Sequence, residues 1–198
     1  MTHVRLDGGA TYEMTLEARC DASPAAVYDV LADLSSHLDW AGKRQHRNFR
    51  LISLRGTGPL KTGSEFTSVG SIPMARSRWE DHSEVVEARP PEVLEFVTDS
   101  LVVWRSGKRT EAVWEHRYEI TPDGSGSSIV YRLRRTAIEN PPLRMSLPLM
   151  RTLTNRVMIP RFCRRGFENL LRSAELRSSM SGVVQTRHAE GMTERAAP

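Results

Sequence analysis

Three ring-bearing side chains share one face of a candidate strand in the second half of the chain. In residues 112–121, Trp114, His116 and Tyr118 alternate with charged or solvent-facing residues. A period of two places them together on the inner face of a sheet. Trp114 and Tyr118 offer flat apolar surface with a polar tip, and His116 offers a group that can exchange a proton near neutral pH. An ordinary core histidine, hydrogen-bonded to a neighbour such as Tyr131, remains an equal interpretation.

An acidic side chain on another candidate strand is the second chemical feature. Trp79, Asp81 and Ser83 share one face, and the residues at 80, 82 and 84 share the other. Trp79 is large and apolar, which favours the register in which its face points inward. Asp81 would then lie in apolar surroundings with a raised pKa, paired with His116 or with an arginine.

Several other chemistries have no support in the sequence. It contains no phosphate-binding loop, no dinucleotide fingerprint, no zinc-ligand spacing and no Gly-x-Ser-x-Gly motif. We therefore expect no metal and no cofactor. Cys20 and Cys163 are far apart in sequence, and two reduced thiols are the preferred interpretation.

Length and composition predict one globular domain. The chain has 198 residues, of which 39% are hydrophobic and 26% charged. It has no apolar run long enough to span a bilayer, and its first residues lack the apolar core of a signal peptide, so we expect a cytoplasmic protein. We predict a flexible N-terminus over 1–10, a folded domain over 11–179, and a disordered tail of small, polar and charged residues over 180–198.

The order of elements predicts an α+β fold. Tyr12 to Cys20 alternates as a half-buried strand, and Ser23 and Pro24 then begin a helix that runs to about Leu34, followed by a second short helix near Trp40. Short strands joined by turns follow, which favours antiparallel pairing, at 49–55, 65–70, 77–88, 93–98, 101–104, 112–121 and 128–135.

A helical period over residues 146–179 ends the folded part of the chain. Pro160 should kink or break this helix, and Gly166 on its apolar face allows a close approach by a ligand or by another segment. Because the strands and helices are segregated, one long helix must cover the apolar face of the sheet. A gap between a curved sheet and such a helix is a common small-molecule site.

Several segments also resemble a known superfamily. They are Cys20 to Asp33, Asp39-Trp40, Gly63 to Phe66, Trp79 to Val85, Pro90 to Phe96, Trp114 to Ile120, and Phe167 to Leu171. Together they are similar to the START-like superfamily called SRPBCC, which includes the polyketide cyclase/dehydrase family, over roughly residues 11–177. The resemblance implies a helix-grip fold, a curved antiparallel sheet wrapped around a long C-terminal helix with two short helices after the first strand. It also implies a hydrophobic cavity.

The leading hypothesis is binding of a small hydrophobic or aromatic ligand, such as a lipid, a polyketide or an isoprenoid-like molecule, between the sheet and the C-terminal helix. Packing or capping roles remain open for Trp40 and its neighbours His37 and Asp39. The candidate lining residues are Trp40, Trp79, Asp81, Trp104, Trp114, His116, Tyr118, Tyr131, Met150, Phe162 and Gly166.

Two alternatives to a pure binding protein follow from the same residues. The first is an enzyme similar to polyketide cyclases and aromatases, in which His116, Tyr118 or Asp81 moves protons during ring closure. The second is weak docking on an anionic membrane or an acidic partner through the basic C-terminal helix.

The net charge of the whole chain is +4, and residues 143–179 hold eight arginines and two glutamates. The solvated outer face of a helix whose other side is core is the preferred explanation of these arginines. No aromatics interleave with them, so we expect no nucleic-acid partner. The oligomeric state is left open by the sequence.

Overall fold

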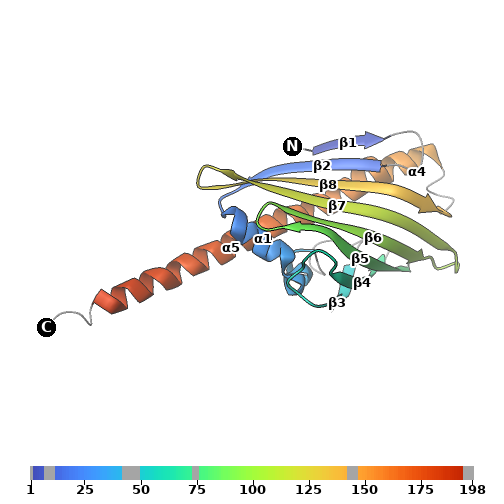
Figure 1. The fold of residues 1–198 in the computed structure, drawn as a ribbon. Helices are drawn as coiled ribbons and strands as arrows, with labels where there is room; N and C mark the ends of the chain where they lie inside the picture. Colours follow the sequence, from blue (N-terminus) through green and yellow to red (C-terminus); the bar gives the residue numbers. More distant parts are fainter. Residues whose placement is uncertain (1, 7–11, 42–49, 73–75, 142–146, 194–198) are drawn as a thin grey trace.

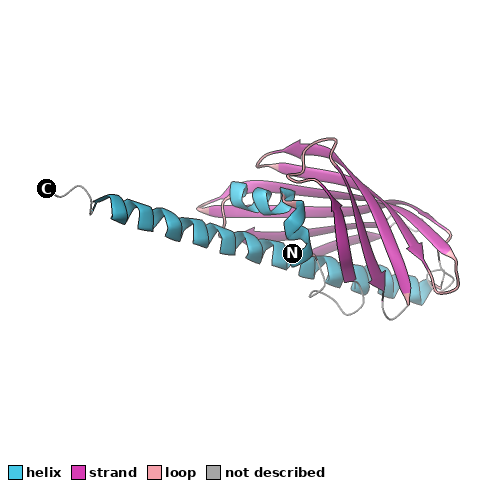
Figure 2. Cartoon of the chain, turned by 90° about the horizontal axis from the view of Figure 1, so that it is seen from below, coloured by secondary structure: helices cyan, strands magenta, loops and turns pink. Residues whose placement is uncertain are grey.

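The fold was analysed in a computed structural model of the chain. It describes residues 2–6, 12–41, 50–72, 76–141 and 147–193, and only the backbone of residues 2–6, 50 and 181–193. Within these ranges the chain forms one curved antiparallel sheet with helices on its concave side (Figures 1 and 2). The predicted α+β helix-grip architecture is therefore confirmed.

Eight strands make up the sheet over the described ranges, in the order β1-β2-β8-β7-β6-β5-β4-β3. Only the connection between β2 and β3 carries the chain from one side of the sheet to the other, which is where the short helices lie. The strands are β1 (Thr2–Leu6), β2 (Tyr12–Cys20), β3 (Arg50–Gly56), β4 (Glu65–Ile72), β5 (Ser77–Arg89), β6 (Val93–Val103), β7 (Arg109–Asp123) and β8 (Gly126–Glu139).

Register irregularities in three strand pairs accompany the curvature of the sheet. They fall between Leu51 and Ser53, between Val85 and Glu87, and opposite Val113 and Trp114, where β8 contains one extra residue. A bulge bends a strand and increases its local twist. The sheet can therefore curl around the helix that covers it.

Helices α1 (Pro24–Ala32), η1 (Leu34–Ser36) and α2 (His37–Trp40) follow β2. The amide of Ala26 donates to Ser23 Oγ at 3.3 Å, and Pro24 occupies the first turn, so α1 begins where the sequence predicted. Its inward stripe consists of Val27, Val30 and Leu31, all completely buried.

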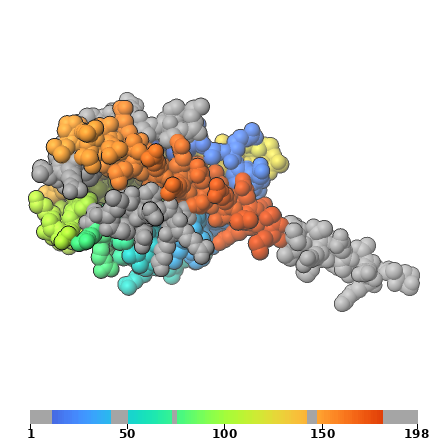
Figure 3. All heavy atoms as spheres, turned by 180° about the vertical axis from the view of Figure 1, so that it is seen from behind, coloured from blue at the N-terminus to red at the C-terminus, as the bar shows by residue number. Residues whose placement is uncertain are grey.

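The C-terminal helical region is α4 (Pro148–Leu153), the π-helical segment η3 (Thr154–Met158) and α5 (Ile159–Thr193). Pro160 cannot donate to the carbonyl one turn back, and the π turn lies directly before it, with the amide of Ile159 bonded to Thr154 O five residues back. The predicted interruption at Pro160 is thus a π turn. Figure 3 shows α4 and α5, in orange and red, running across one face of the molecule.

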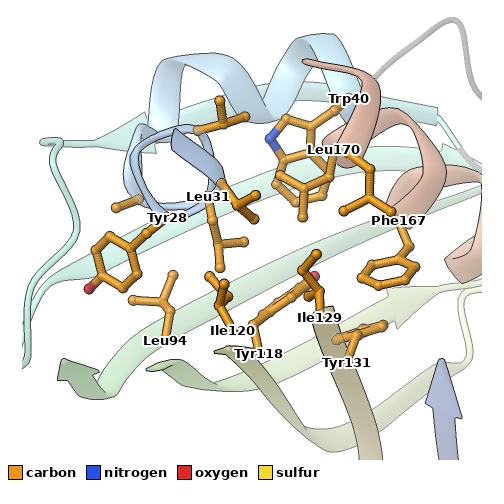
Figure 4. Close-up of a cluster of buried hydrophobic side chains, with 14 of the residues drawn as sticks. Tyr28, Leu31, Trp40, Leu94, Tyr118, Ile120, Ile129, Tyr131, Phe167 and Leu170 are labelled. Atoms are coloured by element: carbon orange, nitrogen blue, oxygen red, sulfur yellow. The ribbon is translucent and has the colours of Figure 1, made fainter. Parts of the chain in front are cut away.

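Helices α1 and α5 bury one half of the concave face. Leu31 and Leu170 are fully buried and face Leu94, Ile120 and Ile129 on the sheet (Figure 4). This layer holds the helices on the sheet and fixes the direction in which α5 crosses it.

Three element boundaries differ from the predictions. Residues 93–103 form one strand, β6, where two short strands were expected, and Thr2–Leu6 form β1, paired with β2, where a flexible end was expected. Helix α5 continues to Thr193, past Met180, where the disordered tail was expected to begin. Figure 1 shows this last part of α5 extending beyond the sheet.

Candidate functional site

The concave face of the sheet has a tightly packed half and a less covered half. Near α1 and α5, Leu94, Tyr118 and Ile120 are buried to 5% exposure or less. Further along the same strands the inward side chains retain more accessible surface; these are Trp79, Asp81, Ser100, Val102, Trp114 and His116. The helices therefore do not fill the second half as they fill the first.

A row of aromatic rings crosses the boundary between the two halves. Phe66 of β4 meets Phe96 of β6 edge to face, with ring centroids 5.5 Å apart. The Phe96 ring lies parallel to the His116 imidazole, with centroids 4.6 Å apart and planes 12° apart. The row continues through Tyr131 of β8 to Phe167 of α5, whose centroids are 6.1 Å apart (Figure 4). These rings give the interior a flat apolar wall.

Polar groups within this row converge on the hydroxyl of Tyr131. His116 Nδ1 lies 3.0 Å from Tyr131 Oη, and the side chains of Tyr118 and Cys163 also interact with that hydroxyl. Burial raises the pKa of Cys163 to about 12 and raises the pKa values of both tyrosines, so all three groups stay protonated at neutral pH.

The surroundings of His116 desolvate its ring, yet the residue is not completely buried. Burial lowers the pKa of its imidazole to about 3, so the ring is neutral at physiological pH. The residue as a whole nevertheless retains some accessible surface, and Nε2 has no hydrogen-bond partner in the described part of the chain. Nε2 is therefore the nitrogen available to a ligand.

Asp81 occupies the second polar position of the inner face. It pairs with Ser68 of β4 and with Ser100 of β6, so strand β5 has the register that Trp79 favoured. Burial raises the pKa of the carboxyl group to about 6, and the hydroxyl groups of Ser100 and Ser68 only partly offset this rise. Beside it, the hydroxyl groups of Ser83 and Thr98 satisfy each other at 2.9 Å.

The expected pairing of Asp81 with His116 is wrong. The two side chains lie on strands separated by β6, and Asp81 aligns with Ala112, four residues away from His116 along β7. At ~4.8 Å per strand and ~3.3 Å per residue, their backbones are roughly 16 Å apart. Neither carboxyl nor imidazole contributes to the other's pKa shift. They can contact opposite ends of one ligand but cannot hydrogen-bond to each other.

Other predicted site residues have structural contacts of their own. Trp40 is buried, and its Nε1 donates to Ser36 Oγ at 3.2 Å, while its neighbour His37 donates to Leu31 O at 2.8 Å. Trp104 donates to Thr110 Oγ1 at 2.8 Å beside the β6–β7 turn. These contacts favour packing over ligand contact for Trp40 and Trp104.

The remaining predicted residues lie on the C-terminal helices. Met150 and Phe162 are partly buried on α4 and α5. Gly166 faces α2, since a Cβ there would lie 4.0 Å from the carbonyl oxygen of Trp40. The close approach expected at Gly166 is therefore to another segment of the chain. An alanine would fit at ordinary van der Waals distance.

Arg135 and Cys163 are functional candidates that the sequence reasoning missed. Arg135 is only 4% exposed, and its guanidinium lies 5.9 Å from the ring centre of Tyr12 and 5.5 Å from that of Trp114. Extending the alternation of Ile129, Tyr131 and Leu133 by one step would have placed Arg135 on the inner face. For Cys163 no such signal exists, because its neighbours on the sheet are set by the path of α5.

No metal centre or membrane span is found in the described ranges. No three His, Cys, Asp or Glu side chains gather there closely enough to bind an ion, and Cys20 and Cys163 are free thiols. No helix of the described chain is both long and apolar enough to cross a membrane.

Comparison with known proteins defines the class. Residues 11–175 match the family described as polyketide cyclase/dehydrase and lipid transport, and the chain belongs to this family. Its members belong to the SRPBCC superfamily, so the domain has a hydrophobic ligand-binding fold. No curated protein matches the sequence significantly.

Solved structures show the same fold at low sequence identity. A putative uncharacterized protein from Rhizobium leguminosarum superposes with a TM-score of 0.60 at 8% identity, over 88% of this chain and 98% of that one. A conserved protein from Geobacillus kaustophilus gives 0.58 at 13% identity, over 83% and 94%. A protein from Arthrobacter aurescens gives 0.57 at 12% identity, over 87% and 90%. At such identity these neighbours support the fold alone.

Proposed function

We propose that this protein binds a small hydrophobic or aromatic molecule, of lipid, polyketide or isoprenoid type, between the concave sheet and the C-terminal helices. The observation that carries the proposal is His116, whose imidazole is desolvated by its surroundings while Nε2 has no hydrogen-bond partner in the described part of the chain. An apolar wall with a few convergent polar atoms is the usual composition of small-molecule sites.

Apolar burial would supply most of the affinity. At ~25 cal/mol per Å² of apolar surface, a ligand that buries about 250 Å² gains roughly 6 kcal/mol before the cost of ordering is subtracted. The stacked rings of Phe96, His116 and Tyr131 would contact a flat ligand across its face. His116 Nε2 would orient one polar atom of that ligand.

Native mass spectrometry of the protein purified from its own host tests this function, followed by denaturing extraction of bound compounds. We expect a hydrophobic compound at about one per chain. The variant His116→Ala should lose most of it, whereas His82→Ala should retain it, because His82 is an exposed histidine on the opposite face of β5. Equal retention by both variants would contradict the proposed site.

The proposal favours binding over proton transfer. A histidine with a pKa of about 3 is a weak base at neutral pH, and catalytic bases work best with a pKa near the operating pH. The cyclase alternative predicts that His116→Ala abolishes turnover of a candidate polyketide and leaves binding largely intact. Loss of binding without measurable turnover in the wild type would support the binding function.

A second candidate function is weak contact with an anionic membrane surface. It is favoured by exposed apolar side chains on α4 and on the residue just before it. Leu147, Leu149 and Leu153 are 54%, 78% and 42% exposed. The exposed Arg151 lies among them in the sequence. Sedimentation with anionic and neutral vesicles tests it. Leu149→Ser should reduce binding to the anionic vesicles, and Leu176→Ser, at a leucine of α5 that is 65% exposed, should not.

A further inference from the structure

Two polar atoms at the less covered end of the inner face lack partners. Oδ1 of Asp81 and Nε1 of Trp79 are buried and form no hydrogen bond with any described residue. They belong to residues two apart on β5, so both side chains are on the concave face. A buried donor and a buried acceptor that are both left unpaired cost free energy in the unliganded protein.

The surroundings of Asp81 contain hydroxyl groups but no compensating cation in the described part of the chain. Ser68 and Ser100 are its neighbours across β4 and β6, and Ser83 and Thr98 are already bonded to each other. The charged neighbours along β5, Glu80 and His82, point to the outer face. The hydroxyl groups of Ser68 and Ser100 interact with the carboxyl group, yet Oδ1 still lacks a partner, so a further hydrogen-bond donor is what this carboxylate can accept.

The side chain of Asp81 is buried only in part. Oδ1 is enclosed, yet the residue as a whole retains accessible surface. The terminal torsion of an aspartate is broad, so rotation exchanges its two oxygens at modest cost. A donor group that arrives on the accessible side can thus reach the carboxylate.

We propose that Asp81 anchors a hydroxyl group at the buried end of the ligand, with Trp79 forming the wall beside it. This inference rests on the proposed function and names the chemical class of the ligand. A hydroxyl group can donate to a carboxylate and can also accept from an indole N–H such as that of Trp79, so its chemistry matches both kinds of unpaired atom on this strand. A carboxylate or phosphate at the same end would be repelled by the like charge of Asp81.

Three probes of matched shape test the anchor, namely 2-naphthol, naphthalene and 2-naphthoate, in equilibrium dialysis at pH 7.5. We expect 2-naphthol to bind about tenfold more tightly than naphthalene, and 2-naphthoate to bind most weakly. In Asp81→Asn the preference for naphthol should fall to about twofold and naphthoate should gain affinity, with naphthalene unchanged. Asp99→Asn, on the outer face of neighbouring β6, should behave as the wild type.

The probes separate failure of the anchor from failure of the site. Equal binding of naphthol and naphthalene, unaffected by Asp81→Asn, would leave the proposed function standing and overturn the anchor. Tight binding of naphthoate by the wild type would overturn it as well. If none of the three probes binds up to its solubility limit, the proposed function fails for aromatic ligands and the anchor fails with it.

Discussion

The Nδ1 atom of His116 lies 3.0 Å from the hydroxyl oxygen of Tyr131, across the pairing of β7 with β8. This contact fixes the edge that the imidazole presents to the interior, because a ring held at Nδ1 leaves only Nε2 for other partners. Tyr131 is itself held by stacking on Tyr118, with ring centroids 4.4 Å apart. The orientation of the His116 ring therefore depends on a tyrosine of the hydrophobic core.

Removing that hydroxyl should destabilise the protein without disturbing the aromatic packing. We expect Tyr131→Phe to lower the free energy of unfolding by about 1–2 kcal/mol, because Nδ1 of His116 loses its partner. Urea unfolding measures the change. Tyr28→Phe is the matched control, since the hydroxyl of Tyr28 is buried without a partner in the described structure and its loss should be neutral or slightly stabilising. Equal losses in both variants would contradict the assigned contact.

The burial of His116 predicts acid sensitivity. Burial lowers the pKa of His116 from 6.5 to about 3, so the folded state resists a proton that the unfolded chain accepts. The resulting stability is fully present above pH 6.5 and is lost as the pH falls towards 3. Between pH 6.5 and 4.5 the loss from this residue is about 2 kcal/mol.

His116→Phe should flatten this part of the stability curve. We expect the variant to lose about 2 kcal/mol less than the wild type between pH 6.5 and 4.5, as measured by urea unfolding at fixed ionic strength. His37 has a pKa of about 4, also lowered by burial, but it is present in both proteins and cancels in the comparison. Parallel curves for the two proteins would show that His116 is not desolvated.

Asp81 should make the folded protein less stable as the pH rises, which is the reverse of the effect of His116. Burial raises the pKa of Asp81 from 3.8 to about 6, so its contribution to stability is complete below pH 3.8 and is lost as the pH rises through 6. At pH 7.5 the ionised carboxylate then costs the folded state up to about 3 kcal/mol. We expect Asp81→Asn to be more stable than the wild type at pH 7.5 and similar at pH 4.

Thermal unfolding at the two pH values checks this prediction. Asp99→Asn serves as the control and should change stability by less than about 0.5 kcal/mol, because Asp99 is exposed on the outer face. A destabilised Asp81→Asn at pH 7.5 would mean that the carboxylate has a compensating partner and is structural.

Period-two alternation was sufficient to find the inner face of the sheet from the sequence. Trp114, His116 and Tyr118 share that face as predicted, and the large apolar Trp79 identified the register of Asp81. Such patterns work because a strand that is buried on one side must alternate in polarity. Local signals also located α1, whose capping serine and first-turn proline begin the helix.

Distances between side chains on different strands were not available from the sequence. The offset between β5 and β7 depends on the register of β6 between them, so no sequence pattern predicts that Asp81 and His116 are separated by four positions. A strict alternation of polarity also does not predict the extra residue in β8 opposite Val113. The alternation of polar and apolar residues along a strand indicates which face of the sheet a side chain is on. Its neighbours on that face depend on how the strands pair.

The turn between β7 and β8 offers a test of the packing that positions these strands. A Cβ at Gly126 would lie 2.2 Å from the carbonyl oxygen of Cys20, so any side chain there must push β2 and β8 apart. We expect Gly126→Ala to cost more than about 3 kcal/mol or to prevent folding, because both partners are backbone atoms and cannot rotate away. Gly124→Ala, two residues earlier, is the control, since its Cβ would meet nothing within 4 Å and its φ of +62° adds only about 1 kcal/mol. Unfolding by urea, followed by circular dichroism, would separate the two, and a Gly126→Ala protein as stable as Gly124→Ala would rule out the close approach of β8 to the end of β2.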